Sequence, residues 1–177
     1  MDPFSLEELY RLHHERVYNL ALHYVQNAED AEEITQDVFV KVHEKLHAFR
    51  GLSEAGTWIY RIAINASLDH LRARKAGKRA FWLRVVSFHG KSAEQEPQNF
   101  NHPGINLEHK EALQGLFRAI NKLPDRQRSA LILLKMEGLS TEEAARIMEL
   151  TPKAMESLFQ RAKAQLKILL HQAKEHE

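Results

Sequence analysis

Apolar residues recur along the first part of the chain with a spacing close to 3.6 residues, which predicts amphipathic helices. Acidic residues open the second of them, where they suit the positive end of a helix dipole. Small and polar residues with two flanking glycines predict a short loop before the third. The three helices are expected over residues 4–26, 28–48 and 57–79, with Asn27 breaking the first two apart.

The apolar period stops between residues 87 and 106, where Gly, Pro, Ser, Gln and Asn are frequent. This composition is typical of a linker. A helical stripe resumes at Leu107, ends at Leu123-Pro124-Asp125, and gives way to another helix that closes at Gly138. The predicted fold class is all-α, with two small helical domains joined by a flexible linker. The domains are expected at residues 1–86 and 107–177.

The end of the chain carries the start signals of two further helices. Ser140 and Glu143 form a capping box, in which the Ser oxygen accepts from a backbone N–H and the Glu reaches back. Thr151 is a good N-cap, and Pro152 suits the first helical position because its missing N–H costs nothing there. A short helix, a tight turn and a longer basic helix predict a helix-turn-helix.

Composition excludes several classes of protein. The 177 residues contain no Cys, which excludes a disulfide scaffold, a Cys-ligated zinc site and a thiol nucleophile. No basic and apolar signal segment begins the chain, and no apolar run is long enough to span a membrane. We therefore expect a cytoplasmic protein without direct membrane insertion, cofactor or metal.

The formal net charge of +1 conceals a strong segregation of charge. Residues 1–68 are predominantly acidic, whereas residues 69–91 contain seven Lys and Arg and a single acidic residue. A local excess of positive charge can engage phosphates even when the whole molecule is nearly neutral. The same pattern also fits a solvated helix face.

Motifs in both blocks resemble those of the extracytoplasmic-function (ECF) sigma factors of the sigma-70 family. In the first block these are DAEEITQDVF at residues 30–39, FRG at 49–51 and TWIYRIAINASLDHLR at 57–72. In the second they are Leu123-Pro124 with Arg128, GLS at 138–140 with EAA at 143–145, and RAK at 161–163 with Leu166. Each motif alone is weak, but their order and spacing are specific.

The resemblance implies a non-enzymatic subunit that gives core RNA polymerase its promoter specificity and opens the promoter DNA. The first block would bind the clamp helices of the largest polymerase subunit and the melted minus-10 strand. The second would bind the polymerase flap and the minus-35 duplex. An anti-sigma factor that covers these surfaces is the further partner that the resemblance implies.

The acid-rich second helix supplies the expected contact with the polymerase clamp. Its polar residues recur at helical spacing and so form one stripe opposite Val38 and Val42. A solvated face is the alternative interpretation of the same stripe. The residues assigned to core-polymerase binding are Asp30, Glu33, Gln36 and Asp37.

The third helix and the loop before it supply the expected minus-10 site. Unpaired bases stack on aromatic rings, while Arg and Asn offer hydrogen bonds to base edges and phosphates. Trp58 could equally be a core residue, and the family's flipped-base pocket maps to residues 49–56. The assigned residues are Phe49, Arg50, Ser53, Thr57, Trp58, Tyr60, Arg61, Asn65, Arg72, Arg74 and Lys75.

The last helix supplies the expected minus-35 site. By position in the family motif, its contacts fall on Lys153, Glu156, Ser157, Gln160 and Arg161. Glu156 departs from the family pattern, in which Lys or Arg is common. Since an acid can accept from a cytosine amino group in the major groove, Glu156 is expected to alter the recognised sequence.

Two other functions fit parts of the sequence. His43-Glu44-Lys45-Leu46-His47 matches the HExxH pattern of zinc proteases, although a third ligand would have to come from Asp69. A helix-turn-helix regulator that binds duplex DNA without core polymerase is the second alternative.

The aromatic segment from Phe81 to Phe88 has no role that the sequence reveals. Family linkers are often more polar at this place.

Overall fold

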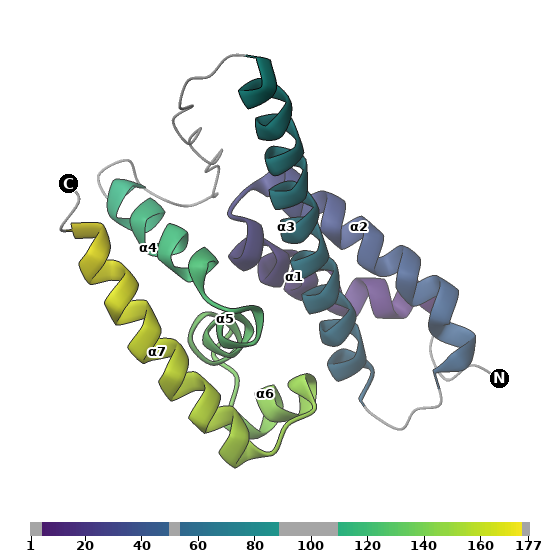
Figure 1. The fold of residues 1–177 in the computed structure, drawn as a ribbon. Coiled ribbons are helices and arrows are strands. Elements are labelled where there is room, and N and C mark those ends of the chain that lie inside the picture. The colour runs from purple at the N-terminus through teal and green to yellow at the C-terminus, as the bar shows by residue number, and fades with distance from the viewer. Residues whose placement is uncertain (1–4, 50–53, 89–109, 175–177) are drawn as a thin grey trace.

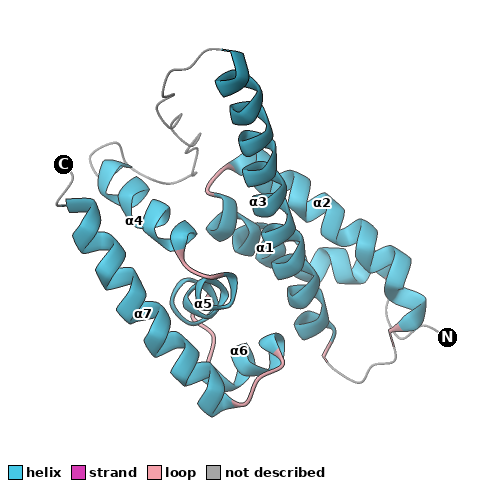
Figure 2. Ribbon diagram, viewed as in Figure 1, coloured by secondary structure: helices cyan, strands magenta, loops and turns pink. Residues whose placement is uncertain are grey.

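A computed structural model describes residues 5–49, 54–88 and 110–174 of the protein. All regular elements in these ranges are helical (Figure 2). The first block contains α1 (Leu6–Val25), α2 (Ala28–Lys45), the short 3-10 turn η1 (Leu46–Ala48) and α3 (Ala55–Phe88). The second contains α4 (Lys110–Lys122), α5 (Asp125–Leu131), the π-helical turn η3 (Ile132–Met136), α6 (Thr141–Met148) and α7 (Pro152–Lys174). The predicted all-α class and the second-block helix-turn-helix are confirmed.

The ends of the helices follow local capping chemistry. Ser5 and Glu8 form a capping box on α1, and Ser140 and Glu143 form the predicted one on α6. Thr151 Oγ1 accepts from the backbone N–H of Ala154 at 3.2 Å, which caps α7 as expected. Asn27 opens α2 as its N-cap and does not simply end α1, because its side chain accepts from Asp30 N–H.

The third helix is longer than the sequence suggested. It was expected to end at Arg79, but α3 continues to Phe88 and beyond the expected edge of the first domain at residue 86. Gly77 is the residue of α3 near Arg79 that disfavours a helix. In a helix interior, Gly costs about 1 kcal/mol of free energy relative to Ala. Since Ala, Lys and Arg surround it and no Pro interrupts residues 72–88, the helix passes through. Most of the expected linker lies outside the described residues.

The two blocks pack directly against each other. In Figure 1, α1, α2 and α3 form one half of the molecule, and α4 to α7 form the other. One cluster of buried apolar side chains runs through both halves: it joins Leu20, Val38 and Ile59 of the first block to Ile132, Leu133 and Ile147 of the second. Across the boundary α3 packs on α6 and α1 packs on η3, and α5 makes hydrogen bonds to both α1 and α3. Within the described ranges, no helix is long and apolar enough to cross a membrane.

Candidate nucleic-acid interface

The acidic face of α2 is exposed as the sequence predicted, except at its first member. Glu33, Gln36 and Asp37 are exposed, while Val38 and Val42 on the opposite side are fully buried. Asp30 instead accepts a hydrogen bond from Arg74 Nη1 at 3.0 Å, and His70 Nε2 lies 3.6 Å from the same oxygen. Asp30 and Arg74, which were assigned to different partners, therefore contact each other.

Two aromatic rings mark the beginning of the expected minus-10 site. Phe49 and Trp58 stack with their ring centroids 4.7 Å apart, and Trp58 also packs on the core. The indole is thus partly structural and partly accessible. Thr57 is half-buried beside it, whereas Arg50 and Ser53 lie outside the described residues.

Tyr60 is buried between the two blocks. Only 4% of the residue is exposed to solvent, and the guanidinium carbon of Arg16 lies 5.7 Å from the centroid of its ring. Its Oη donates to Glu137 Oε2 at 3.0 Å, while His23 Nδ1 lies 2.8 Å from Oε1 of the same carboxylate. Burial and the charge of Glu137 raise the pKa of Tyr60 to about 12, which keeps the phenol protonated as a donor. In this arrangement the ring is not available to stack on a base.

One face of α3 carries three of the assigned residues, Arg61, Asn65 and Arg72. They share this face because the successive spacings are four and seven residues, close to one and two helical turns. Arg61, the first, reaches across to the helix-turn-helix. Its guanidinium donates to the carbonyl oxygens of Arg146 at 2.7 Å and Ile147 at 3.0 Å, at the C-terminal end of α6. It also pairs with Glu149 Oε1 at 2.9 Å. A cation at this end of a helix satisfies free carbonyls and the negative end of the dipole.

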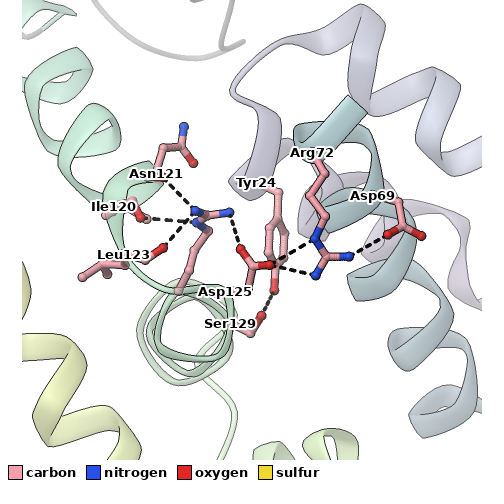
Figure 3. Close-up of polar contacts among 9 residues, drawn as sticks. Tyr24, Asp69, Arg72, Ile120, Asn121, Leu123, Asp125 and Ser129 are labelled. Carbon is pink, nitrogen blue, oxygen red and sulfur yellow. Dashed lines mark hydrogen bonds and ion pairs between the residues drawn. The ribbon is translucent and has the colours of Figure 1, made fainter. Parts of the chain in front are cut away.

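Arg72 makes the second bridge on this face (Figure 3). Its guanidinium donates to Asp125 Oδ2 at 2.7 Å and to Asp69 Oδ1 at 2.8 Å. Asn65, between Arg61 and Arg72, remains exposed, as does Lys75 one turn further. The face expected to take the minus-10 strand is therefore partly engaged by α5 and α6 of the same chain.

A buried hydrogen bond lies behind these contacts (Figure 3). Tyr24 Oη on α1 donates to Ser129 Oγ on α5 at 2.7 Å. Both residues are almost completely buried, and burial strongly raises the pKa of Tyr24. Sequence patterns do not predict this pair, because its two residues are 105 positions apart and neither belongs to a DNA-contact motif.

The assigned minus-35 residues form an open face. Spacings of three and four residues bring them to one side of α7, where all five are exposed: Lys153, Glu156, Ser157, Gln160 and Arg161. Met155 and Ala162 are fully buried on the other side. The side chain of Glu156 points away from the core on a surface that also carries two cations, so the face is compatible with a duplex.

The second block owes its turn geometry to two residues with positive φ. Gly138 has a φ of +65°, and Leu139 N–H bonds to Leu133 O at 3.1 Å across it. Glu149 has a φ of +55° in the turn of the helix-turn-helix. This left-handed backbone conformation is sterically unfavourable for a residue that has a Cβ atom. The Glu149 side chain is the one that Arg61 holds.

The HExxH residues do not form a metal centre in this arrangement. His43 lies at the end of α2 and His47 in η1, and both are exposed. Among the residues that the structure describes, no three His, Asp or Glu side chains gather closely enough to hold a metal ion. The zinc-protease alternative therefore lacks its third ligand here.

Comparison with known proteins identifies the same two blocks. Residues 9–77 match the family model Sigma-70 region 2, and residues 113–166 match Sigma-70, region 4. The chain is 30% identical to the ECF RNA polymerase sigma factor SigM of Mycobacterium tuberculosis, over 96% of this chain and 79% of that protein. It is 34% identical to the ECF RNA polymerase sigma-E factor of Escherichia coli K12, over 76% of this chain and 70% of that protein.

Two solved structures have a similar fold. The sigma factor RpoE in complex with the anti-sigma factor NepR, from Bartonella quintana, has a TM-score of 0.60 at 24% identity. The match covers 93% of this chain and 96% of that chain. CnrH in complex with the cytosolic domain of CnrY also has a TM-score of 0.60, at 25% identity over 94% of this chain and 87% of that one.

Proposed function

The chain belongs to the ECF family of RNA polymerase sigma factors, and from this premise we propose how its surfaces divide the work of initiation. The exposed acidic stripe of α2, formed by Glu33, Gln36 and Asp37, docks on the clamp helices of the polymerase. The first turns of α7 enter the major groove at the minus-35 element. The Arg61–Asn65–Arg72 face of α3, with Trp58, holds the melted minus-10 strand.

The observation that best supports this division is the open face of α7. Five polar side chains project from one side of a helix whose N-terminus is capped and whose back is buried. Helix-turn-helix proteins read the major groove with the N-terminal part of the second helix. A good bidentate contact from such a face discriminates between bases by about 1–3 kcal/mol.

Strand opening has a separate physical basis in the first block. Stacking on aromatic side chains contributes about 1–3 kcal/mol per unpaired base. The half-exposed ring of Trp58 and the exposed amide of Asn65 supply a stacking surface and hydrogen bonds. The exposed cations Arg72 and Lys75 continue this surface and favour phosphates.

The role requires no reaction chemistry from this chain. We propose that it acts in the cytoplasm, as a non-enzymatic subunit, together with core polymerase and promoter DNA. An anti-sigma factor is a further proposed partner. The similar sigma factor RpoE of Bartonella quintana is seen in complex with the anti-sigma factor NepR.

Replacement of Asn65 tests the assignment with little risk to folding, because its side chain is exposed. Asn65→Ala should lower open-complex formation about tenfold or more, as permanganate reactivity of unpaired thymines reports, while core-polymerase affinity stays unchanged. Asn19→Ala is the matched control, since it removes the same group from an exposed position of α1. Equal loss of core binding and promoter opening would refute the assigned role.

A further inference from the structure

The last turns of α3 take no part in the function proposed above. The match to Sigma-70 region 2 ends at residue 77 and the match to region 4 begins at residue 113, whereas α3 continues to Phe88. These turns therefore lie outside both matched regions. They also contain the aromatic segment from Phe81 to Phe88, which no motif explains.

The same turns project beyond the packed part of the first block (Figure 1). Arg74 pairs with Asp30 in the first turn of α2, so α2 begins at the level of Arg74. At a rise of about 1.5 Å per residue, residues 75–88 extend the helix by about 20 Å past that level. Residues at the beginning of this extension are exposed, namely Lys75, Ala76, Gly77 and Arg79.

Charge in this part of the helix has a single sign. No Asp or Glu occurs from residue 70 to residue 93, whereas six Lys and Arg fall between residues 72 and 84. Arg72 and Arg74 pair with carboxylates in the fold. No acidic residue lies within four positions of the other four along the helix: Lys75, Lys78, Arg79 and Arg84. This cluster favours an anionic surface as its partner.

Apolar residues follow the cations along one side of the helix. Trp82 and Val85 come eleven and fourteen residues after Leu71, close to three and four helical turns, so all three positions share a side. Leu71 is buried in the core of the first block, where α1 and α2 pack on α3. The apolar register of α3 thus continues beyond the level at which α2 begins.

We propose that the C-terminal turns of α3 bind the surface of a membrane that contains anionic phospholipids. The turns with Phe81, Trp82 and Val85 enter the boundary between headgroups and acyl chains, and the cations before them bind lipid phosphates. Helices that lie at a bilayer surface combine Lys and Arg with Trp, Phe and Leu. The contact is peripheral, because Arg84 lies among the apolar residues and a charge at the bilayer centre is costly.

The apolar residues favour a membrane over a nucleic acid. Cations alone would suit the phosphates of DNA equally well, and aromatic rings can stack on unpaired bases. Here, however, Leu83, Val85 and Val86 accompany the rings. Aliphatic residues neither stack on bases nor form hydrogen bonds with them, whereas transfer from water to the acyl boundary favours them. Trp is also enriched at membrane interfaces.

The charge dependence is tested by flotation of the full chain with vesicles of phosphatidylcholine, with and without phosphatidylglycerol. Each Lys or Arg near an anionic surface favours binding by about fivefold. The parent should prefer the anionic vesicles, and Lys78→Glu with Arg79→Glu should lower its partition coefficient about tenfold or more. Lys163→Glu with Lys167→Glu is the matched control, because it makes the same charge change at two exposed positions of α7 and should retain most of the affinity.

The apolar contact is tested with the chain's own fluorescence. The chain contains two Trp, so Trp58→Phe leaves Trp82 as the sole reporter. Anionic vesicles should shift its emission to the blue, and vesicles with brominated acyl chains should quench it. Trp82→Ser with Val85→Ser should weaken vesicle binding about tenfold or more. The control replaces two exposed apolar residues elsewhere, Leu12→Ser with Ile168→Ser, and should bind like the parent.

Three results would overturn the inference. The first is equal binding of the parent to neutral and anionic vesicles, or binding to neither. The second is equal loss in the variants and their controls, or vesicle binding without quenching of Trp82. The third is a loss of affinity for random-sequence duplex DNA in Lys78→Glu with Arg79→Glu while the parent ignores vesicles, which would assign these cations to a nucleic acid.

Vesicle binding is measured without polymerase and so is independent of the proposed function. A chain that supports initiation with core polymerase but does not bind anionic vesicles would refute this inference alone. A chain that binds the vesicles as described but supports no initiation would refute the proposed function alone.

Discussion

Arg128 should be the most sensitive single position for the stability of the second block. The residue is 2% exposed, and its guanidinium donates to three backbone carbonyls at the end of α4: Ile120 at 3.3 Å, Asn121 at 2.7 Å and Leu123 at 3.0 Å. Asp125 Oδ1 lies 3.5 Å from Arg128 Nη1, and Figure 3 labels Asp125 together with the three acceptor residues. The side chain thus ties the end of one helix to the beginning of the next.

Arg128→Met keeps much of the volume but leaves those carbonyls without their donor. A buried acceptor that loses its partner costs about 1–3 kcal/mol. The three losses do not add fully, because the carbonyls relax and the burial penalty that lowers the pKa of Arg128 is relieved. A net destabilisation of about 3–5 kcal/mol is expected, as when one partner of a buried ion pair is removed. That is a large share of the roughly 5–15 kcal/mol that stabilises a domain.

Denaturant unfolding followed by circular dichroism measures this difference as a shift of the midpoint. Arg126→Met is the matched control, because Arg126 lies two residues earlier on α5 and is exposed. Its change should stay within about 0.5 kcal/mol. A loss below about 1 kcal/mol for Arg128→Met would show that water satisfies the carbonyls equally well, and the account of the α4–α5 junction would be wrong.

Three further predictions concern the other buried and capping groups. Burial and the charge of Arg16 lower the pKa of His13 below 6.5, so the folded state binds fewer protons than the unfolded one just below that pH. Stability should therefore fall as the pH is lowered through about 6.5 in the parent, and less so in His13→Gln, with His43→Gln as the exposed control. Ser140→Ala should cost about 1 kcal/mol in thermal or denaturant unfolding, because it removes the cap of α6; no loss would contradict the capping-box geometry. A double-mutant cycle of Tyr24→Phe and Ser129→Ala should give a coupling of about 1 kcal/mol in unfolding, whereas zero coupling would mean that the blocks do not meet in solution.

Local chemistry accounts for the features that the sequence predicted correctly. A capping box needs residues three apart, so Ser140 and Glu143 could be paired by inspection. The same holds for Thr151 and Pro152, which set the start of α7, and for the exposed side of that helix. The polar side of α2 follows from periodicity alone, because Val38 and Val42 must be buried on the other side.

Features that depend on distant partners could not be read from the sequence. Arg61 looks like a nucleic-acid contact in its motif, yet in the fold it caps α6, some 85 residues away. Glu137 and Ser129 belong to no motif, and the chain's helical periodicity says nothing about which blocks meet. The sequence prediction ends the third helix at Arg79, but α3 continues to Phe88 because Gly77 costs only about 1 kcal/mol relative to Ala and no Pro follows it in the helix.

Mapping of transcription starts tests the central claim most directly. Core RNA polymerase is incubated with fragmented genomic DNA, with and without this protein, and the new 5′ ends are sequenced. A sigma factor of this family should yield discrete starts that share two upstream elements and vanish when either the protein or core polymerase is omitted. Binding of the protein to duplex DNA with no polymerase-dependent starts would contradict the claim and favour a helix-turn-helix regulator that acts alone.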